Sequence, residues 1–484
     1  MFKKTIALLL AVLCLGTLLA GCGSSETDPK TTSAAPDVTE PAEVTSADDG
    51  RDRVPAMDLG GAEFTFWSGV SEFYHGNLVV EEENGELFND ARYDCVRNVE
   101  ERFNVDINEI TSATVSSPKN AVLAGEDAYD VTNLYSSTAI TWAQEGLTYI
   151  LDDLPYVDTT RPYWNQSINE ALSIRNKSYF AVAPFNLSVY DFAHAMLFNK
   201  GMIEDYNLEN PYKLVNDGKW TLDTYTKLTV AATKDVNGDS QYTGDDQYGF
   251  LAQPKAVLPG FWIASGESTI RKDADGTLYF AAIGNERFAS LIDRLFAITW
   301  DNNTWYQNES TTNYDDLLRN MFKNNQGLLF DTQFFYIESL RDMETDFGII
   351  PYPKYDEAQD EYYTRLETIY LFNVPVTNTE LESTSAIIEA LACEAYYTVI
   401  PAYYDVSLKT KYTRDDESSA MLDILFDSLT VDYGDTVWCG NIRDGIFRLM
   451  FLNNTRNLAS DLASIEETVN KLLTDTMDAY AALE

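Results

Sequence analysis

The spacing of hydrophobic residues changes repeatedly along the chain and predicts alternating strands and helices. Residues 63–67 form a short run of apolar and aromatic side chains, which is typical of a strand. In the segment 90–103, Val96, Val99 and Phe103 fall on one helical face, which predicts a helix. A strand followed by an amphipathic helix is the first half of a βαβ unit.

The same alternation continues beyond this helix. Residues 105–107 form a second apolar run, and residues 129–131 with Leu134 form a third. Residues 139–146 have helical character and end at a glycine. This rhythm predicts an α/β fold in which parallel strands are joined by crossover helices.

The folded part is too long for a single core. Residues 57–484 have the composition of a globular protein, and a chain of this length exceeds what one hydrophobic core usually serves. Two domains or lobes are therefore expected.

The net charge excludes some partners. The formal net charge is −43 at pH 7, and loss of residues 1–21 with Lys3 and Lys4 would bring it to −45. Such a chain repels nucleic acid and anionic membrane surfaces, so neither is expected as a partner. The acidity alone does not indicate a cationic ligand, because most of the 77 carboxylates form a solvated surface.

The first residues have the pattern of a secretory leader. Lys3 and Lys4 precede an apolar run, 6–20, that is too short for a spanning helix. The run ends in Leu-Ala-Gly-Cys at residues 19–22, which resembles the lipobox of bacterial lipoproteins. The resemblance implies that residues 1–21 are removed and that Cys22 is lipidated. The alternative is an ordinary secretory signal with a chance cysteine.

The segment after the leader is predicted to be a disordered linker. Residues 22–56 are rich in Ser, Thr, Pro and acidic residues and contain no aromatic residue. Such a segment buries too little apolar surface to offset its ordering entropy. The remaining cysteines, Cys95, Cys393 and Cys439, are widely spaced and are expected to be buried free thiols, with at most one bridge.

Several segments of the folded part carry a family resemblance. Residues 126–131, 147–154, 198–200, 218–223 and 346–351 follow one another in a characteristic order. They are similar to segments of the bacterial extracellular solute-binding proteins of family 1, the sugar-type receptors of ABC importers. Within residues 218–223, Thr221 or Asp223 could also simply cap the helix that follows, with Trp220 packed under its start.

The resemblance implies a two-lobed, periplasmic-binding-protein-like α/β fold of type II. Each lobe would be a mixed sheet flanked by helices, with a hinge between the lobes. Lobe one would comprise residues 57–187 and 366–400, and lobe two residues 192–362 and 401–484.

The function implied is capture of a solute between the lobes and delivery to an ABC permease. Closure would occur at hinge segments 183–193 and 363–375. The family and the aromatic content favour an oligosaccharide, while a peptide or polyol stays open. The protein is expected to be a monomer on the extracellular face of the cell membrane, held there by the lipid on Cys22 alone.

Candidate ligand-binding residues are those that follow predicted strands or lie at predicted crossings. Trp262 and Glu267 follow a predicted strand at 248–251, and Asp331 and Gln333 follow one at 327–330. Trp438 and Arg443 stand at the start of a predicted late helix. Ligands of open α/β sheets bind beyond the carboxyl ends of the strands, and sugars stack on aromatic rings. The candidates are Trp67, Tyr135, Ser136, Tyr190, Asp191, Trp262, Glu267, Asp331, Gln333, Trp438 and Arg443.

One acidic segment has the spacing of a calcium-binding loop. Its oxygen donors at loop positions 1, 3, 5, 7, 9 and 12 are Asp235, Asn237, Asp239, the carbonyl of Gln241, Thr243 and Asp246. Ser240 stands at the position that prefers glycine, so it must adopt a positive φ. The segment is predicted to hold a structural calcium ion, and the alternative is a solvated turn that binds no metal.

No catalytic motif accompanies these features. His75 and His194 are the only histidines, and neither belongs to a serine-nucleophile or phosphate-loop motif. The protein is therefore not expected to be an enzyme. Two rivals stay open: a surface glycan-binding or adhesive lipoprotein not coupled to transport, and a secreted glycosidase that uses a pair of carboxylates.

Overall fold

The computed structural model describes residues 51–69, 77–307 and 314–483. Contacts divide the chain into Met1–Ala47 and Asp48–Glu484. The leader, Cys22 and most of the linker lie outside the described residues, as does His75. Residues 51–56 do not behave as linker, because Val54 is buried and Asp52 forms an ion pair with Arg102 of the first long helix.

The first sheet contains three parallel strands and one antiparallel strand. Its order is β11-β3-β1-β2, with β1 (Ala62–Gly69), β2 (Val105–Ser112), β3 (Val131–Tyr135) and β11 (Tyr370–Asn373). β1 pairs with β2 and β3 in parallel, and β11 pairs with β3 in the antiparallel sense. Phe64, Phe66 and Trp67 are all buried, as expected for a strand covered on both faces.

The second sheet is also mixed. Its order is β5-β8-β4-β9, with β4 (His194–Asn199), β5 (Tyr248–Leu251), β8 (Gly327–Gln333) and β9 (Phe347–Ile350). β5 and β8 are parallel, and β4 runs antiparallel to both β8 and β9. The carboxyl ends of β5, β8 and β9 therefore meet the first residue of β4 at one edge.

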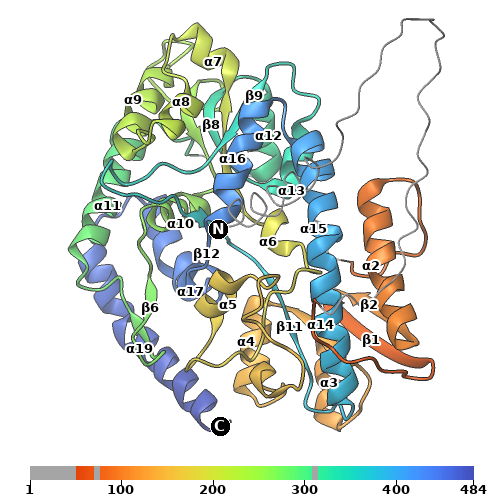
Figure 1. The fold of residues 1–484 in the computed structure, drawn as a ribbon. Helices are drawn as coiled ribbons and strands as arrows, with labels where there is room; N and C mark the ends of the chain where they lie inside the picture. Colours follow the sequence, from red (N-terminus) through yellow and green to blue (C-terminus); the bar gives the residue numbers. More distant parts are fainter. Residues whose placement is uncertain (1–50, 70–76, 308–313, 484) are drawn as a thin grey trace, which may run out of the picture. The chain divides into compact units, whose positions relative to one another are not determined.

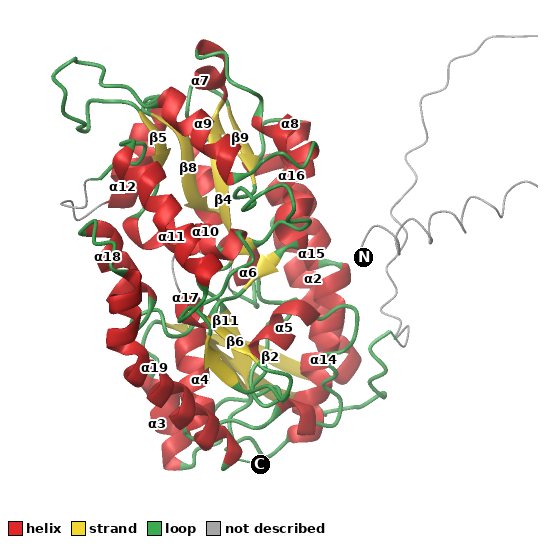
Figure 2. Cartoon of the chain, turned by 90° about the vertical axis from the view of Figure 1, so that its left-hand side faces the viewer, coloured by secondary structure: helices red, strands yellow, loops and turns green. Residues whose placement is uncertain are grey.

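Helices cover both sheets (Figure 1, Figure 2). They are α2 (Leu87–Phe103), α3 (Ser116–Ala124), α4 (Ser136–Gln144), α5 (Gln166–Leu172), α6 (Ser188–Asp191), α7 (Lys200–Asp205), α8 (Pro211–Asn216), α9 (Leu222–Ala232), α10 (Pro254–Ala264), α11 (Glu286–Phe296), α12 (Tyr314–Lys323), α13 (Phe334–Ile337), α14 (Leu381–Tyr397), α15 (Val399–Ala402), α16 (Asp416–Asp427), α17 (Tyr433–Thr436), α18 (Leu449–Leu452) and α19 (Leu458–Ala481).

Short 3₁₀ and π segments and two small ribbons complete the fold. They are the 3₁₀ turns η1 (Leu151–Asp153) and η3 (Glu338–Leu340), the π-helical segments η2 (Ala297–Asp301), η4 (Tyr403–Tyr412) and η5 (Arg443–Arg448), and the strand pairs β6 (Ile270–Lys272) with β7 (Leu278–Phe280) and β10 (Thr364–Arg365) with β12 (Leu429–Thr430).

The chain crosses between the sheets at paired segments. Residues 363–375, which we call the crossing segment, contain β10 and then β11 of the first sheet. An antiparallel bridge joins Ala193, directly before β4, to Leu366 in this segment. The two segments predicted to form the hinge are therefore in contact.

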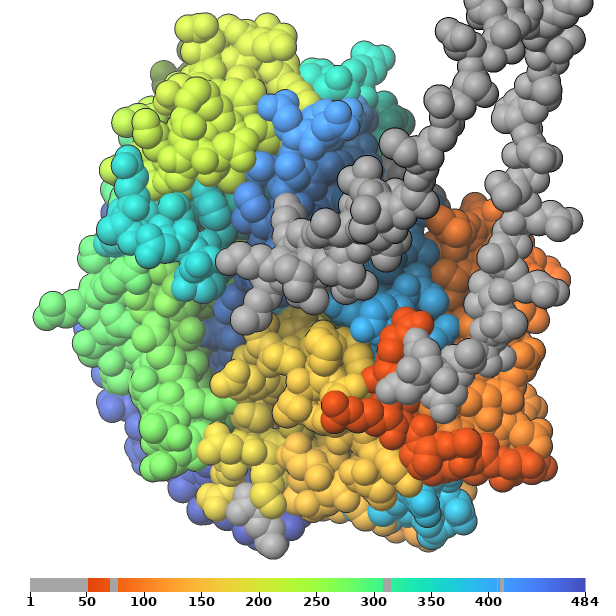
Figure 3. All heavy atoms as spheres, in the orientation of Figure 1, coloured from red at the N-terminus to blue at the C-terminus, as the bar shows by residue number. Residues whose placement is uncertain are grey.

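C-terminal elements pack against both halves of the fold. α16 packs on β9, and η5 packs on α10, both beside the second sheet. α19 contacts α4 and α11, and the Tyr480 hydroxyl donates to the Ile140 carbonyl of α4 at 3.1 Å. In Figure 3, the darkest blue residues, which belong to the C-terminal end, show along the lower left margin beside the green and yellow segments.

The strands and helices expected from the sequence are largely present. β5 has the predicted bounds, whereas α2 begins at Leu87 and α4 at Ser136, before the predicted starts. β8 extends to Gln333, so Asp331 and Gln333 are the last residues of the strand rather than residues beyond it. Thr221 caps α9 through a capping box with Thr224.

Two further properties concern the thiols and the membrane. Cys95, Cys393 and Cys439 are free thiols, the first two buried. Within the described ranges, no helix combines the length and the apolarity needed to cross a bilayer.

Candidate ligand-binding site

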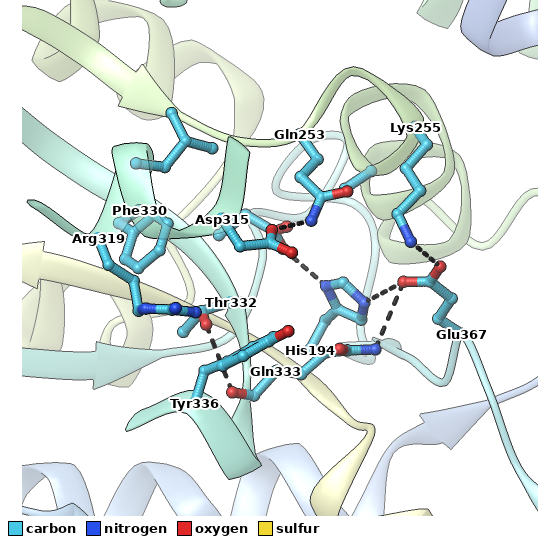
Figure 4. Close-up of a pocket in the computed structure, with 13 residues that line it drawn as sticks. His194, Gln253, Lys255, Asp315, Arg319, Phe330, Thr332, Gln333, Tyr336 and Glu367 are labelled. Carbon is cyan, nitrogen blue, oxygen red and sulfur yellow. Dashed lines mark hydrogen bonds and ion pairs between the residues drawn. The ribbon is translucent and has the colours of Figure 1, made fainter. Parts of the chain in front are cut away.

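A polar cavity lies at the carboxyl edge of the second sheet (Figure 4). Its volume is about 90 Å³. The lining residues come from the start of β4, the end of β8, the starts of α10 and α12, α13 and the crossing segment: His194, Gln253, Lys255, Ala256, Asp315, Leu318, Arg319, Phe330, Asp331, Thr332, Gln333, Tyr336 and Glu367.

Local sequence fixes the side chains contributed by α10. Gln253 precedes Pro254, which occupies the first helical position and suits it because proline lacks the N–H that would go unpaired there. Gln253 and Lys255 are thus held directly after β5, where the strand delivers them to the edge of the sheet. This is the position at which open α/β sheets bind ligands.

Glu367 of the crossing segment is the most highly connected carboxylate of the cavity. It accepts from Lys255 Nζ at 2.8 Å and from Arg443 Nη1 at 2.9 Å. Burial opposes its ionisation, but Lys255, Arg365 and Arg443 outweigh this effect and hold the pKa of Glu367 well below its usual range. Glu367 therefore stays ionised in the interior.

A second acid, Asp435 of α17, shares the same cations. Arg365 Nε lies 2.7 Å and Nη2 2.8 Å from the Asp435 carboxylate oxygens, a bidentate pair with both side chains fully buried. Arg443 Nη1 also reaches the Asp435 carbonyl at 3.2 Å. The crossing segment is thus tied by ion pairs to α10, α17 and η5.

His194 joins this network to the sheet. Its Nδ1 lies 2.8 Å from Asp331 Oδ1, and its Nε2 lies 3.1 Å from Glu367 Oε2 and 3.0 Å from Arg365 Nη1. Burial lowers the pKa of His194, but the carboxylates of Asp331 and Glu367 outweigh burial and raise it overall. The Tyr352 hydroxyl donates to the same Asp331 oxygen at 2.6 Å.

The opposite wall of the cavity comes from α12. The Gln253 side-chain amide donates to Asp315 Oδ1. Arg319 pairs with Asp316, and its guanidinium lies 4.4 Å from the Tyr336 ring centroid. Its Nη1 is buried and has no hydrogen-bond partner among the described residues. Burial raises the pKa of Asp315, which Lys255 and Arg319 offset only in part.

The structure brings together five of the residues chosen from the sequence. Asp331 and Gln333 line the cavity, and Arg443 binds Glu367. Tyr135, at the end of β3, meets Thr368 of the crossing segment with 3.3 Å between the two hydroxyl oxygens. Its neighbour Ser136 donates to the Thr436 carbonyl of α17 at 3.0 Å.

The other six candidates have packing or ion-pair partners elsewhere. Trp67 is buried in β1, and Trp262 packs between Phe288 and Phe447. Trp438 packs against Tyr433, before η5 rather than within it.

Two of these six lie in α6 and one in a separate charge cluster. Tyr190 packs on Tyr403, whose hydroxyl donates to the buried carboxylate of Asp191. Glu267 accepts from Arg287 at 2.7 Å and from Asn285 at 2.8 Å. None of the six lines the cavity, and their contact with a ligand stays a prediction.

Sequence reasoning missed most of the charged lining. Gln253 and Lys255 stand immediately after the correctly predicted strand β5, so the strand-end rule could have found them. The sequence offers His194 only as a candidate catalytic base or metal ligand, without a motif for either role. Glu367 carried one signal, its place in a predicted crossing segment.

The predicted calcium loop forms a closed turn. Asp235 accepts from the backbone N–H groups of Gly238 and Ser240, each at 2.7 Å, and Ser240 has φ of +64° as expected. The Asp246 carboxylate accepts from Val236 and Thr243. Among the described residues, no group of three or more His, Cys, Asp or Glu side chains is placed to hold a metal ion. Calcium binding stays a prediction.

Comparison with known proteins places the fold. No protein-family model matches the chain, and no curated protein matches it either. Solved structures do match. A cyclo/maltodextrin-binding protein complexed with maltotetraose aligns with a TM-score of 0.58 at 11% identity, over 87% of this chain and 97% of that one.

Two further structures agree. UspC of M. tuberculosis aligns with a TM-score of 0.55 at 13% identity, over 86% of this chain and 100% of that one. An ABC substrate-binding protein from Listeria monocytogenes in complex with cycloalternan gives 0.53 at 14% identity, over 86% and 99%. This chain has their two-lobed fold. The predicted fold class is confirmed, and the residue bounds of each lobe stay a prediction.

Proposed function

We propose that the protein is the solute-binding component of an ABC importer and that it captures an oligosaccharide at the cavity of the second sheet. The observation that carries the proposal is this polar cavity, which lies at the sheet edge where the crossing segment passes. Its amide, hydroxyl, carboxylate and guanidinium groups suit the hydroxyls of a sugar. Proteins of the same fold were solved with maltotetraose and cycloalternan, which supports a saccharide.

Capture requires the cavity to open. At about 90 Å³ it is smaller than the roughly 300–1,000 Å³ typical of small-molecule sites, so it accommodates only part of an oligosaccharide. Movement of the lobes about the crossing segment would admit the solute, and closure would add contacts from both lobes. The solute shifts the equilibrium because only the closed state makes both sets of contacts.

Delivery and anchoring complete the proposal. The closed protein docks on a membrane permease, which receives the solute. Lipid on Cys22 holds the protein on the extracellular face, and residues 23–50 act as a tether. The protein carries out no catalysis, in keeping with the substrate-binding proteins that share its fold.

The test is titration calorimetry of the purified protein with mono- and oligosaccharides, peptides and polyols. We expect micromolar or tighter binding confined to saccharides, accompanied by a decrease in the radius of gyration in X-ray scattering. Binding of a long polymer without compaction would instead favour the adhesive lipoprotein. Release of a chromogenic aglycone would favour the glycosidase.

A matched pair of variants locates the site. Gln333→Ala removes an amide from the cavity wall and should weaken saccharide binding. Gln166→Ala removes an exposed amide at the start of α5 and should leave it unchanged. Equal affinities of the two variants would place the saccharide site elsewhere.

A further inference from the structure

The three acids of the cavity are unequally neutralised. Glu367 has Lys255 and Arg443 within 2.9 Å. Among the described residues, Asp331 forms an ion pair with His194 alone. Asp315 has no cation within ion-pair distance among the residues described, and the Gln253 amide is its single hydrogen-bond donor there. Asp315 is therefore the one acid of the three that lacks an ion pair among the described residues.

Carboxylate oxygens remain available on this side of the cavity. Gln253 occupies Asp315 Oδ1, while His194 and Tyr352 both occupy Asp331 Oδ1. Within the described ranges, Oδ2 of neither residue has a hydrogen-bond partner. Both residues line the cavity, so a bound solute meets two acceptors that the protein leaves unused.

The nearby cations are already engaged. Lys255 Nζ lies 2.8 Å from Glu367, and Figure 4 shows its side chain directed to that carboxylate. Arg319 pairs with Asp316 and lies over the Tyr336 ring. Its free Nη1 can donate to a hydroxyl or ring oxygen of the solute, but it forms no ion pair with Asp315.

This arrangement has an electrostatic cost that a cationic ligand removes. Burial raises the pKa of Asp315, and the attraction of Lys255 and Arg319 only partly offsets burial and the smaller repulsion of Glu367 and Asp331. A neutral hydroxyl could donate to the same carboxylate oxygen, but it would bring no positive charge to stabilise the ionised form of Asp315. A ligand cation would stabilise that form, because opposite charges within about 4–6 Å favour the ionised carboxylate.

We propose that the captured solute is an amino sugar with a free, protonated amine, which forms an ion pair with Asp315 beside the open oxygen of Asp331. Arg319 Nη1 then donates to an adjacent sugar oxygen and fixes the orientation of the ring. The inference rests on the proposed function, since it names the class of saccharide that the same cavity takes.

The experiment compares two ligands of equal length and linkage. Titration calorimetry is run with a glucosamine oligosaccharide that has free amines and with its fully N-acetylated counterpart, at a pH at which the amine is protonated. We expect the free amine to bind about tenfold tighter or more, because charged hydrogen bonds are worth roughly twice neutral ones.

Variants assign the preference to Asp315. Asp315→Asn should abolish the preference for the free amine. Asp315→Glu keeps the charge and should retain the preference, and it serves as the test if the asparagine variant folds poorly. Asp217→Asn makes the same change of charge at an ion pair with Lys213 on α8, neither of which lines the cavity, and should leave the preference intact.

The outcomes separate the two proposals. Equal affinity for the two ligands, or tighter binding of neutral maltodextrins, would overturn the amino-sugar inference while leaving saccharide capture standing. A preference that survives in Asp315→Asn would overturn the role of Asp315. Failure of every saccharide to bind would overturn both.

Discussion

Replacing Glu367 with glutamine should destabilise the protein strongly, because two buried arginines and the partly exposed Lys255 depend on this carboxylate. Arg365 is fully buried, and Glu367 and Arg443 expose 6% and 7% of their side chains. Glu367→Gln keeps the volume but removes the charge that faces Lys255, Arg365 and Arg443. Uncompensated buried charge is the costly case for a broken ion pair.

The size of the stability loss in Glu367→Gln depends on the hydrogen-bond and ion-pair partners that remain. The glutamine oxygen can still accept from Lys255 or Arg443, but its amide nitrogen then lies where Gln333 Nε2, another donor, approaches at 3.4 Å. Asp435 remains to neutralise Arg365. Removal of one partner from a buried pair costs about 3–5 kcal/mol, and we expect about 3 kcal/mol here.

The assay is urea denaturation followed by tryptophan fluorescence, with Glu338→Gln as the matched control. Glu338 pairs with Arg341 at 3.2 Å, and both side chains are about half exposed. An exposed pair of this kind contributes roughly 0–1 kcal/mol. A loss below about 1 kcal/mol in both variants would refute the conclusion that Glu367 neutralises the buried cations.

Three further predictions follow from other parts of the structure. An added Cβ at Gly249 would lie 2.4 Å from the Thr229 carbonyl oxygen, so Gly249→Ala should cost about 2–3 kcal/mol in the same assay. Gly440→Ala, with nothing within 4 Å of the added carbon, should leave stability within about 1 kcal/mol of wild type. Burial raises the pKa of Glu389 from 4.5 to about 7, so the native state binds its proton more tightly than the unfolded state. The protonated Glu389 side chain therefore contributes up to about 3 kcal/mol to the free energy of unfolding below pH 4.5. This stabilisation is lost as the pH rises through about 7. Glutamine does not ionise, so the melting temperature of Glu389→Gln should not show this loss between pH 4.5 and 7.5. Parallel curves for wild type and Glu389→Gln would contradict the assignment of the pH dependence to Glu389. If Asp235, Asp239 and Asp246 hold calcium, the ion should raise the melting temperature of wild type but not that of Asp246→Asn. At 100 times the dissociation constant, calcium would stabilise the folded wild type by about 2.7 kcal/mol. No difference between calcium and chelator would leave the loop as a solvated turn.

The sheet architecture was predictable because each strand carries its own local signal. The run Phe64, Phe66, Trp67 and the apolar start of β8 are short, dense and bounded by polar residues. The crossing segment could also be placed, and the bridge between Ala193 and Leu366 lies within the two predicted hinge ranges. Boundaries were less accurate, since β8 includes three polar residues, 331–333, that were predicted to follow the strand.

Aromatic content was a weaker guide to the site. Trp67, Trp262 and Trp438 follow or flank predicted strands and helices, and all three are at least nine-tenths buried against other side chains. A tryptophan at a strand end and a tryptophan in a core have the same local sequence pattern. Large aromatic residues are highly buried on average, so position along the chain cannot separate the two roles.

The charged lining shows why the rest of the site escaped prediction. Glu367 binds Arg443, Lys255 and His194, which are 76, 112 and 173 residues away in the sequence. No local pattern can contain such a set, because it exists only after both sheets have formed and the chain has crossed between them. What the sequence does offer is the position of Glu367, between the apolar residues Leu366 and Ile369, in a segment predicted to cross between the lobes. An ionisable residue is almost never fully buried unless it is paired. In a two-lobed chain, an acid in a buried crossing segment therefore indicates a network of cations at the same place, and it is a stronger pointer to the site than any single aromatic ring.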